Sequence, residues 1–390
     1  MSFLPTMDAW PRERVQALYE KITPGDVEAA LTREERSVHD LAALLSPAAI
    51  PYLESMAREA QRLTRWHFGR TINLYAPIYI SNLCAADCVY CGFAAHSGSH
   101  EKRTTLTPDQ IRQECQALAA MGYQNILLLT GEAPRAVPVD YIAEAVSIAR
   151  AFFPSVSVEI YALDEDGYRM LCARGLEGVT LYMETYDRET YPKLHLSGQK
   201  MDYVFRLDAM EHAGLAGTRR MSIGVLLGLF DWRIDAVWLG LHARHLQKEC
   251  WQSAVALSFP RLRHTPARFA LEHPVSDAEL VQMMLAMRLF LPEAGFNLST
   301  REPAALRDRL ISLGVTSMSA GSSTRPGGYA THREGYTGHS REGCEVLEQF
   351  EIEDDRPPAE VVAAIRKAGY DPVWKDFDRA FDAIDDVHIC

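Results

Sequence analysis

The chain has 390 residues, of which 40 are lysine or arginine and 52 are aspartate or glutamate, so its formal net charge is −12. This acidic excess argues against a general nucleic-acid binder, and no apolar run approaches the ~20 residues of a membrane-spanning helix. The N-terminal residues lack the basic and apolar segments of a secretory signal, so we expect a cytoplasmic protein that binds neither nucleic acid nor membrane.

The first part of the chain, residues 1–68, is predicted to be a helical extension. Thr23 and Ser46 have helix-capping character and precede stretches with apolar residues at helical spacing. From residue 69 onward, short apolar and β-branched runs alternate with amphipathic stretches. The eight runs are 72–81, 125–132, 155–162, 178–185, 219–229, 253–262, 296–302 and 315–323. Several helices are expected to stop at a glycine, namely Gly122, Gly214, Gly295 and Gly314.

Eight strands that alternate with helices predict an α/β fold, a (βα)8 TIM-type barrel over residues 69–330 with N- and C-terminal helical extensions. Residues 331–390 form the second extension, which we expect to pack on the barrel. A doubly wound open sheet competes with this architecture, because periodicity does not separate the two. Either fold places the site at the C-terminal ends of the strands, although a polar strand end can also be merely solvated. The polar residues there are Ser81, Asn82, Gly131, Glu132, Glu159, Glu184, Arg261, Arg301, and Ser319 to Ser323.

Three of the eight cysteines follow the first predicted strand with the spacing C-x3-C-x2-C, at Cys84, Cys88 and Cys91. A structural zinc site needs four ligands, and only His96 or His100 lies near enough in sequence to supply the fourth. A four-iron cluster held by three thiolates would instead keep one iron open for a substrate or cofactor. Cys115 and Cys172 lie on helical stretches and are predicted to be small core residues, while Cys250, Cys344 and Cys390 have no partner cysteine in a motif.

The cysteine motif, with the aromatic Tyr90 before its last cysteine, resembles that of the radical S-adenosylmethionine superfamily. The resemblance implies a [4Fe-4S] cluster on Cys84, Cys88 and Cys91, whose open iron chelates S-adenosyl-L-methionine, and a 5′-deoxyadenosyl radical formed from that cofactor. The superfamily's Gly-Gly-Glu-like segment corresponds in this chain to Thr130-Gly131-Glu132, which would bind the ammonium of the cofactor. The remaining residues assigned to the cofactor are Tyr90, Glu159, Glu184 and Arg206, and either glutamate could bind a ribose hydroxyl or a substrate amine.

Longer segments, among them LLLTGEAP, LYMETYDRETYPKLHLSGQKMDY and SMSAGSSTRPGGY, resemble the aromatic amino acid lyases of this superfamily, and in particular their tyrosine lyases. That resemblance implies cleavage of the Cα–Cβ bond of L-tyrosine to 2-iminoacetate and p-cresol, for the thiazole moiety of thiamin. Arg301 suits a bidentate role on the substrate carboxylate, with Ser319, Ser322 and Ser323 as hydroxyl donors beside it. Arg261 is a second anion-binding candidate. Tyr79 could reach the substrate or the cluster, or be a core aromatic on the face that it shares with Tyr75 and Pro77.

The implied partners are thiazole synthase, as acceptor of the imine, and flavodoxin or ferredoxin, as electron donor. A tryptophan lyase would share the barrel, the cluster and the carboxylate anchor. The tyrosine lyases that mature iron-only hydrogenases use a second C-terminal cluster, which the isolated Cys344 and Cys390 do not support. From another class, a non-catalytic iron–sulfur carrier or a zinc-binding protein remains an alternative. The segment 321–329, rich in glycine, could close over the site or be only a turn.

Overall fold

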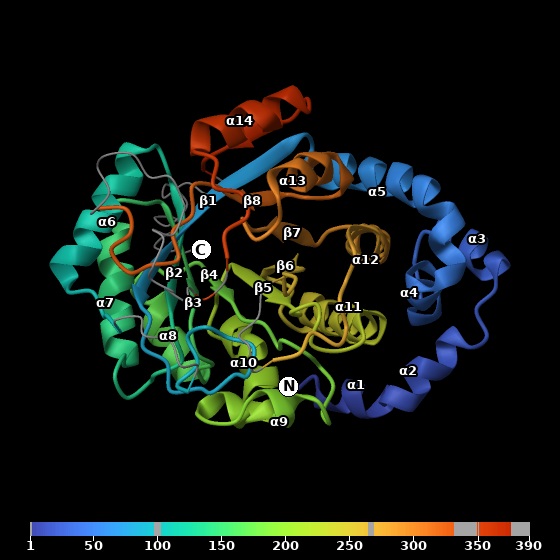
Figure 1. Cartoon of the computed structure of the whole chain (residues 1–390), viewed down its shortest axis with the longest axis horizontal. Helices are drawn as coiled ribbons and strands as arrows, with labels where there is room; N and C mark the ends of the chain where they lie inside the picture. The colour runs from blue at the N-terminus through green and yellow to red at the C-terminus, as the bar shows by residue number, and fades with distance from the viewer. Residues whose placement is uncertain (1, 97–102, 264–268, 331–348, 350, 376–390) are drawn as a thin grey trace, which may run out of the picture.

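The computed structural model describes residues 2–96, 103–263, 269–330, 349 and 351–375. Its centre is a closed barrel of eight parallel strands, in which each strand pairs with the next and β1 pairs with both β2 and β8 (Figure 1). The strands are β1 (Thr71–Ser81), β2 (Asn125–Thr130), β3 (Ser155–Glu159), β4 (Gly178–Thr180), β5 (Arg220–Gly224), β6 (Ala254–Ser258), β7 (Gly295–Leu298) and β8 (Ser317–Ser319). The predicted (βα)8 barrel is confirmed, because the β1–β2 ladder closes what would otherwise be an open sheet.

Seven of the eight strands end earlier than their apolar runs predict. The run 178–185, for example, forms ladder pairs only over β4, and Glu184 returns to the sheet as an isolated bridge to Val225. These runs continue into the loops above the barrel, where their apolar residues are buried by packing rather than by strand pairing. The length of an apolar run therefore indicates how many residues are buried, and it overestimates how many of them pair with a neighbouring strand.

Helices cover the outside of the barrel between successive strands. They are α6 (Pro108–Ala120), α7 (Val139–Arg150), α8 (Glu165–Cys172), α9 (Tyr191–Leu194), α10 (Tyr203–Leu215), α11 (Trp232–Glu249), α12 (Asp277–Phe290) and α13 (Ala304–Leu310), with 3-10 turns η2 (Gln199–Met201) and η3 (Ile311–Leu313). Gly122 and Gly314 follow their helices with positive φ, as predicted. The predictions for Gly214 and Gly295 are wrong: Gly214 lies inside α10, where a Cβ would meet the Cys250 sulfur at 2.4 Å, and Gly295 begins β7.

The N-terminal extension consists of α1 (Leu4–Ala9), α2 (Arg12–Tyr19), α3 (Pro24–Thr32), α4 (Val38–Leu45), η1 (Pro47–Tyr52) and α5 (Leu53–Phe68). These helices wrap around α11 and α12 at one side of the barrel (Figure 1). The Gln282 side chain on α12 donates to the carbonyls of Leu44 and Ser46. The buried apolar side chains of these helices belong to the same hydrophobic core as those of the barrel. Residue 68 therefore marks where the helices end along the sequence, and a separate domain that ends there stays a prediction.

The described part of the C-terminal extension contains α14 (Pro358–Lys367) and β9 (Asp371–Val373). β9 pairs in parallel with the first residues of β1, Thr71 to Asn73. β2 does not reach this part of β1, because the β1–β2 ladder begins at Ala76. Arg307 on α13 forms a fully buried ion pair with Asp354, which fixes the extension to the barrel. Most of residues 331–390, including Cys344 and Cys390, lie outside the described residues. Among the described helices, none has both the length and the apolar character needed to cross a membrane.

Candidate functional site

Two adjoining pockets lie at the C-terminal ends of the strands. The first contains the cysteine motif, and its wall includes Cys84, Cys88, Cys91, Gly131, Glu132, Glu184, Lys200 and Arg206. The second lies within the barrel and is lined by residues of β1, β7 and β8. The two share Glu159, Tyr182, Pro260 and Arg301, so a ligand in one can touch a ligand in the other at these residues. We call the first the cysteine pocket and the second the barrel pocket.

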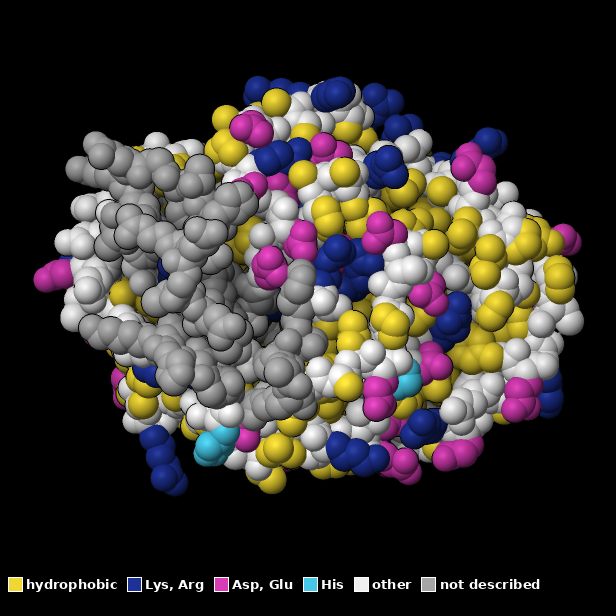
Figure 2. All heavy atoms as spheres, in the orientation of Figure 1, with side chains coloured by type: hydrophobic (Ala, Val, Ile, Leu, Met, Phe, Trp, Pro, Cys, Tyr) yellow, Lys and Arg dark blue, Asp and Glu magenta, His cyan; other side chains and the backbone are white. Residues whose placement is uncertain are grey.

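Basic side chains gather near the centre of the face drawn in Figure 2, over the region labelled β6 and β7 in Figure 1. Arg261 and Arg263 follow β6, Arg301 follows β7, and all three line the cysteine pocket. Arg261 does not supply a free anion site, because it forms a bidentate pair with Glu302 and a further ion pair with Asp277 at 2.8 Å. The prediction that Arg261 binds an anionic ligand is therefore not supported.

The loop that carries the cysteines is held on both sides by backbone hydrogen bonds. Ala85 N donates to the Glu132 carbonyl at 2.8 Å, and Val89 N donates to the Leu194 carbonyl at 3.0 Å. Cys88 also pairs with His195 as an isolated antiparallel bridge. The loop therefore takes its position from the segment after β2 and from the segment that follows α9.

The three thiols suit a multinuclear cluster better than one metal ion. Among the described residues, no three cysteine, histidine or acidic side chains are arranged to hold a single ion, although all three cysteines line one pocket. His96 is turned to Asp87, with 3.2 Å between Nδ1 and Oδ2, and His100 lies outside the described residues. Burial raises the pKa of Cys91 to about 11 and also raises the pKa values of Cys84 and Cys88, so ligation must displace their protons.

Gly131 is required by the cysteine loop. A Cβ at this position would lie 2.2 Å from the Leu83 carbonyl oxygen and 3.0 Å from the Cys84 Cβ. From the sequence alone, this glycine is predicted to let the backbone approach a ligand closely. The structure adds a different close approach, between two segments of the protein itself.

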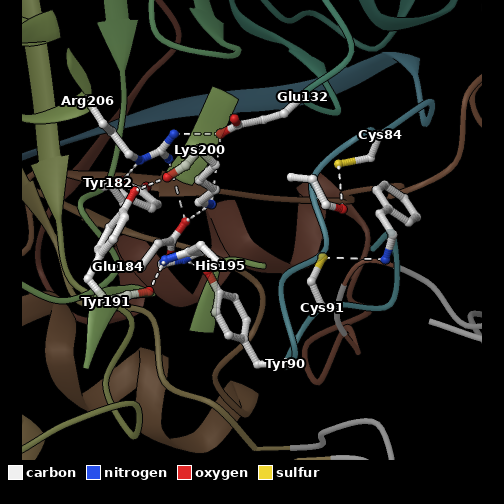
Figure 3. Close-up of polar contacts among 12 residues, drawn as sticks. Cys84, Tyr90, Cys91, Glu132, Tyr182, Glu184, Tyr191, His195, Lys200 and Arg206 are labelled. Carbon is white, nitrogen blue, oxygen red and sulfur yellow. Dashed lines mark hydrogen bonds and ion pairs between the residues drawn. The ribbon is translucent and has the colours of Figure 1, made fainter. Parts of the chain in front are cut away.

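Four charged side chains meet beside the cysteines (Figure 3). Arg206 on α10 donates to Glu132 at 2.5 Å and to the Tyr182 carbonyl at 2.8 Å. The Lys200 ammonium lies 2.7 Å from a Glu184 carboxylate oxygen and 3.9 Å from Glu132. Burial would raise the pKa of Glu184, but Lys200 and Arg206 outweigh it and hold that pKa below its ordinary value. The cluster thus contains two anions and two cations.

Tyr90, the aromatic residue before Cys91, is fixed by a buried histidine. Its hydroxyl lies 2.8 Å from His195 Nε2, while His195 Nδ1 lies 2.9 Å from the Tyr191 carbonyl (Figure 3). Burial, together with the charges of Lys200 and Arg206, lowers the pKa of His195 to about 2, so the imidazole is neutral. Nδ1 must donate to the carbonyl, and Nε2 therefore accepts from the Tyr90 hydroxyl.

Of the residues predicted to bind substrate, Tyr79, Arg301, Ser319 and Ser322 line the barrel pocket. Tyr79 donates to the Gln349 side chain, and Tyr75 and Pro77 share its interior face as the strand alternation predicts. Ser323 lies elsewhere: its hydroxyl accepts from Arg325 N, and it lines neither pocket. The reason is that β8 ends at Ser319, so alternation along an extended strand no longer holds at Ser323.

The glycine-rich segment 321–329 is anchored and shows no sign of acting as a lid. The Tyr329 hydroxyl donates to the Pro77 carbonyl at 2.8 Å, and Tyr329 N contacts both Glu114 carboxylate oxygens at 3.1 Å. Gly321 has a φ of 53° and packs against Pro358. Of the two predicted roles, closing loop or turn, the structure favours the turn.

Glu159 ends β3 at the boundary of the two pockets. Burial raises its pKa to about 7, with Glu184 acting in the same direction and Arg301, Lys200 and Arg206 against it. A carboxyl with such a pKa can exchange a proton near neutral pH, which is typical of a functional site.

Sequence reasoning missed Lys200, His195 and Gln349. Lys200 and Gln349 line the cysteine pocket, and His195 holds Tyr90 from behind. His195 and Lys200 lie in the segment KLHLSGQK, between helices rather than at a strand end, so the barrel rule did not point to them. Gln349 comes from the C-terminal extension, where no motif marks it.

Comparisons with known proteins agree with this geometry. Family models for the Radical SAM superfamily and for the Biotin and Thiamin Synthesis associated domain match residues 78–237 and 258–371. The 2-iminoacetate synthases of Escherichia coli (strain K12) and Salmonella typhimurium (strain LT2) are 43% and 42% identical to this chain, each over 91% of both chains. A crystal structure of HydG, a maturase of the [FeFe]-hydrogenase, is 30% identical with a TM-score of 0.84, covering 94% of this chain and 80% of that chain.

The first family model spans the cysteine motif, Glu132, Glu159, Glu184 and Arg206, and the second begins at the end of β6 and includes Arg301. High identity over nearly the whole length excludes a likeness confined to the barrel. The chain belongs to the radical SAM superfamily and, within it, to the family of the 2-iminoacetate synthases.

Proposed function

We propose that this protein is a lyase that cleaves the Cα–Cβ bond of L-tyrosine to 2-iminoacetate and p-cresol, with 5′-deoxyadenosine and methionine formed from S-adenosylmethionine. The observation that carries the proposal is the 43% identity to a 2-iminoacetate synthase over 91% of the chain. Two pockets that meet at Glu159 and Arg301 support it, because a cofactor and a substrate must react where they touch. The matched Biotin and Thiamin Synthesis associated domain supports the thiazole moiety of thiamin as the destination of the imine.

Cys84, Cys88 and Cys91 are proposed to hold a [4Fe-4S] cluster. When bound, the reduced cluster supplies the electron that cleaves S-adenosylmethionine and so generates the adenosyl radical. The charged side chains beside the cysteines suit the amino-acid part of that cofactor, since Glu132 can accept from its ammonium and Arg206 can donate to its carboxylate. Tyr90, fixed by His195, and Glu184 are then available to the adenosine part.

Arg301 is proposed to bind the carboxylate of tyrosine from the wall that the pockets share. A guanidinium binds a carboxylate through two parallel hydrogen bonds, which also sets the orientation of the amino acid. The buried Ser322 hydroxyl has no hydrogen-bond partner of good geometry among the described residues, whereas the Ser319 hydroxyl lies beside the Tyr75 hydroxyl, and both serines line the same pocket. An anionic group there could accept a hydrogen bond from the Ser322 hydroxyl.

Glu159 is proposed to receive a proton from the substrate ammonium, so that a hydrogen can be removed from a neutral amine. Its position between the pockets places the carboxyl close to both ligands, and its pKa of about 7 suits proton exchange at neutral pH. Tyr79, at the barrel-pocket side of the cysteine loop, helps to exclude water through its bond to Gln349.

Two protein partners follow from this chemistry. The imine product is unstable in water, so we propose direct transfer to thiazole synthase. The electron must come from outside the chain, and reduced flavodoxin or ferredoxin is the proposed donor.

An anaerobic assay tests the function. The protein with reconstituted cluster is incubated with S-adenosylmethionine, dithionite and, separately, L-tyrosine, L-tryptophan or L-phenylalanine. We expect p-cresol and 5′-deoxyadenosine in equal amounts from tyrosine alone. Indole-type products from tryptophan would move the assignment to a tryptophan lyase, and an iron-free, zinc-loaded protein would refute a radical mechanism altogether.

A second candidate is a HydG-like maturase, which the TM-score of 0.84 favours on structural grounds. The supply of ligands for a second cluster argues against it, because the only cysteines after Cys250 in the sequence are Cys344 and Cys390, both outside the described residues and without a neighbouring cysteine. Iron analysis separates the two: one four-iron cluster per chain supports the thiazole enzyme, and iron for two clusters supports the maturase.

A further inference from the structure

Lys200 has no role in the function proposed above, yet its ammonium is buried in the cysteine pocket. Its side chain is 9% exposed and contacts Glu184 at 2.7 Å and Glu132 at 3.9 Å. Figure 3 shows the Lys200 side chain between these two carboxylates, with the Arg206 guanidinium also beside them. A buried lysine is costly unless its charge is compensated, so its retention as a cation needs a reason.

One reason lies in the conformation of Glu184. This residue has a φ of 68°, the sole positive φ at a non-glycine position among the described residues, in a region that L-residues rarely adopt. Arg206 is already bonded to Glu132 and to the Tyr182 carbonyl, and it approaches Glu184 only to 3.7 Å. Lys200 therefore makes the short contact that holds the Glu184 carboxylate in the pocket.

A second reason is the fixed placement of Lys200 relative to the cysteines. The segment before it, residues 194–196, is bonded to both sides of Cys88: Val89 N donates to the Leu194 carbonyl, and Leu196 N donates to the Asp87 carbonyl, each at 3.0 Å. The Ser197 hydroxyl donates to the Ala85 carbonyl at 2.9 Å. These bonds fix the segment before Lys200 to the cysteine loop, and the contacts with Glu184 and Glu132 hold its buried ammonium in the cysteine pocket.

We propose that Lys200 is a positioning residue of the cofactor site, which holds the Glu184 carboxylate in the cysteine pocket and stabilises the reduced state of the cluster by its positive charge. Reduction adds one electron to the cluster, and a nearby fixed cation in a buried pocket favours the state with more negative charge. The proposal rests on the proposed cluster but not on the identity of the amino acid substrate.

The test is a redox titration of the reconstituted protein with dithionite as the reductant, followed by the electron paramagnetic resonance signal of the reduced cluster, without any amino acid. Lys200→Met should shift the midpoint potential to a more negative value. Binding of S-adenosylmethionine, measured by equilibrium dialysis, should weaken roughly 10- to 100-fold, as expected when a charged hydrogen-bond partner is lost. Lys193→Met, a change of an exposed lysine on α9, is the matched control and should change neither quantity.

Two further variants separate charge from position. Lys200→Arg should keep the wild-type potential, whereas Lys200→Gln should lower the potential like Lys200→Met while retaining more cofactor affinity, because an amide can still donate to Glu184. If Lys200→Met takes up too little iron for a titration, the midpoint potentials of Lys200→Gln and Lys200→Arg are compared instead, and a more negative potential in Lys200→Gln supports the proposal. Equal potentials in wild type, Met and Gln variants at equal iron content would overturn the proposal. Failure of the wild type to bind iron would instead refute the proposed function, so the two failures are distinguishable.

Discussion

Replacing Gly131 by alanine tests whether this glycine serves the cysteine loop or the cofactor. The added Cβ would lie 2.2 Å from the Leu83 carbonyl oxygen, while real Cβ atoms essentially never come within 3.0 Å of a heavy atom, so the two backbones must separate by at least 0.8 Å. The Leu83 carbonyl belongs to the backbone and the position of a Cβ is set by its own backbone, so no rotamer change relieves this conflict. Overpacking of this kind costs about 1–3 kcal/mol. The displacement falls on Cys84, the next residue, and on the Ala85–Glu132 hydrogen bond.

The assay is iron and sulfide content after anaerobic reconstitution, with thermal unfolding of the metal-free protein measured in parallel. We expect Gly131→Ala to lower cluster content at saturating iron, because metal ligation tolerates displacements of only about 0.2 Å. Gly25→Ala, where the nearest atom is 3.7 Å away, is the matched control and should load like the wild type. Full cluster content with weakened binding of S-adenosylmethionine alone would refute this reasoning, since it would show that Gly131 serves only the approach of the cofactor.

Three other predictions concern the substrate and the fold. Arg301→Lys should lower kcat/KM for tyrosine roughly 10- to 100-fold, because lysine cannot make a bidentate pair, while iron content stays unchanged; full activity would remove Arg301 from the carboxylate site. For the wild type, kcat/KM should rise as the pH increases through about 7, because burial raises the pKa of Glu159 to about 7 and only the ionised carboxylate can accept a proton. Glu159→Gln should abolish this rise. If the rise persists in the variant, the titrating group is not Glu159. Asp354→Ala should destabilise the fold by about 3–5 kcal/mol in denaturant unfolding, since it leaves the Arg307 charge buried without its carboxylate, whereas Asp109→Ala in an exposed pair should cost less than about 1 kcal/mol.

The sequence predicted the barrel and the cysteine motif because both are local signals. Eight apolar runs separated by amphipathic stretches specify alternating strands and helices, and a C-x3-C-x2-C spacing specifies a loop of thiols without reference to the rest of the fold. Glu132, Glu159 and Arg301 were found by the rule that strand ends carry the site, and they line the pockets. That rule failed for Ser323, because the ladder of β8 stops four residues earlier, and for Arg261, because Glu302 uses its charge.

Residues that act through another residue could not be predicted in this way. His195 is assigned by its bond to the Tyr90 hydroxyl, across 105 residues of sequence, and Lys200 by its contact with Glu184. These contacts exist only in the folded chain. The segment that carries His195 and Lys200 also has no strand-like or helical pattern of apolar residues that would draw attention to it. A histidine between helices is more often a core residue than a functional one, and burial alone would not have changed that expectation.

The balance of charge beside the cysteines explains why this pocket suits the amino-acid part of its proposed cofactor. Glu132 and Glu184 are compensated by Lys200 and Arg206, so the pocket carries no net charge from these four side chains and each has an opposite partner. A ligand with a single charge would take one partner away and leave another buried charge uncompensated, which is strongly unfavourable. A zwitterionic group brings an ammonium and a carboxylate together, so each displaced side chain regains an opposite charge. Selection for an α-amino acid moiety therefore follows from the pairing already present among the protein's own side chains.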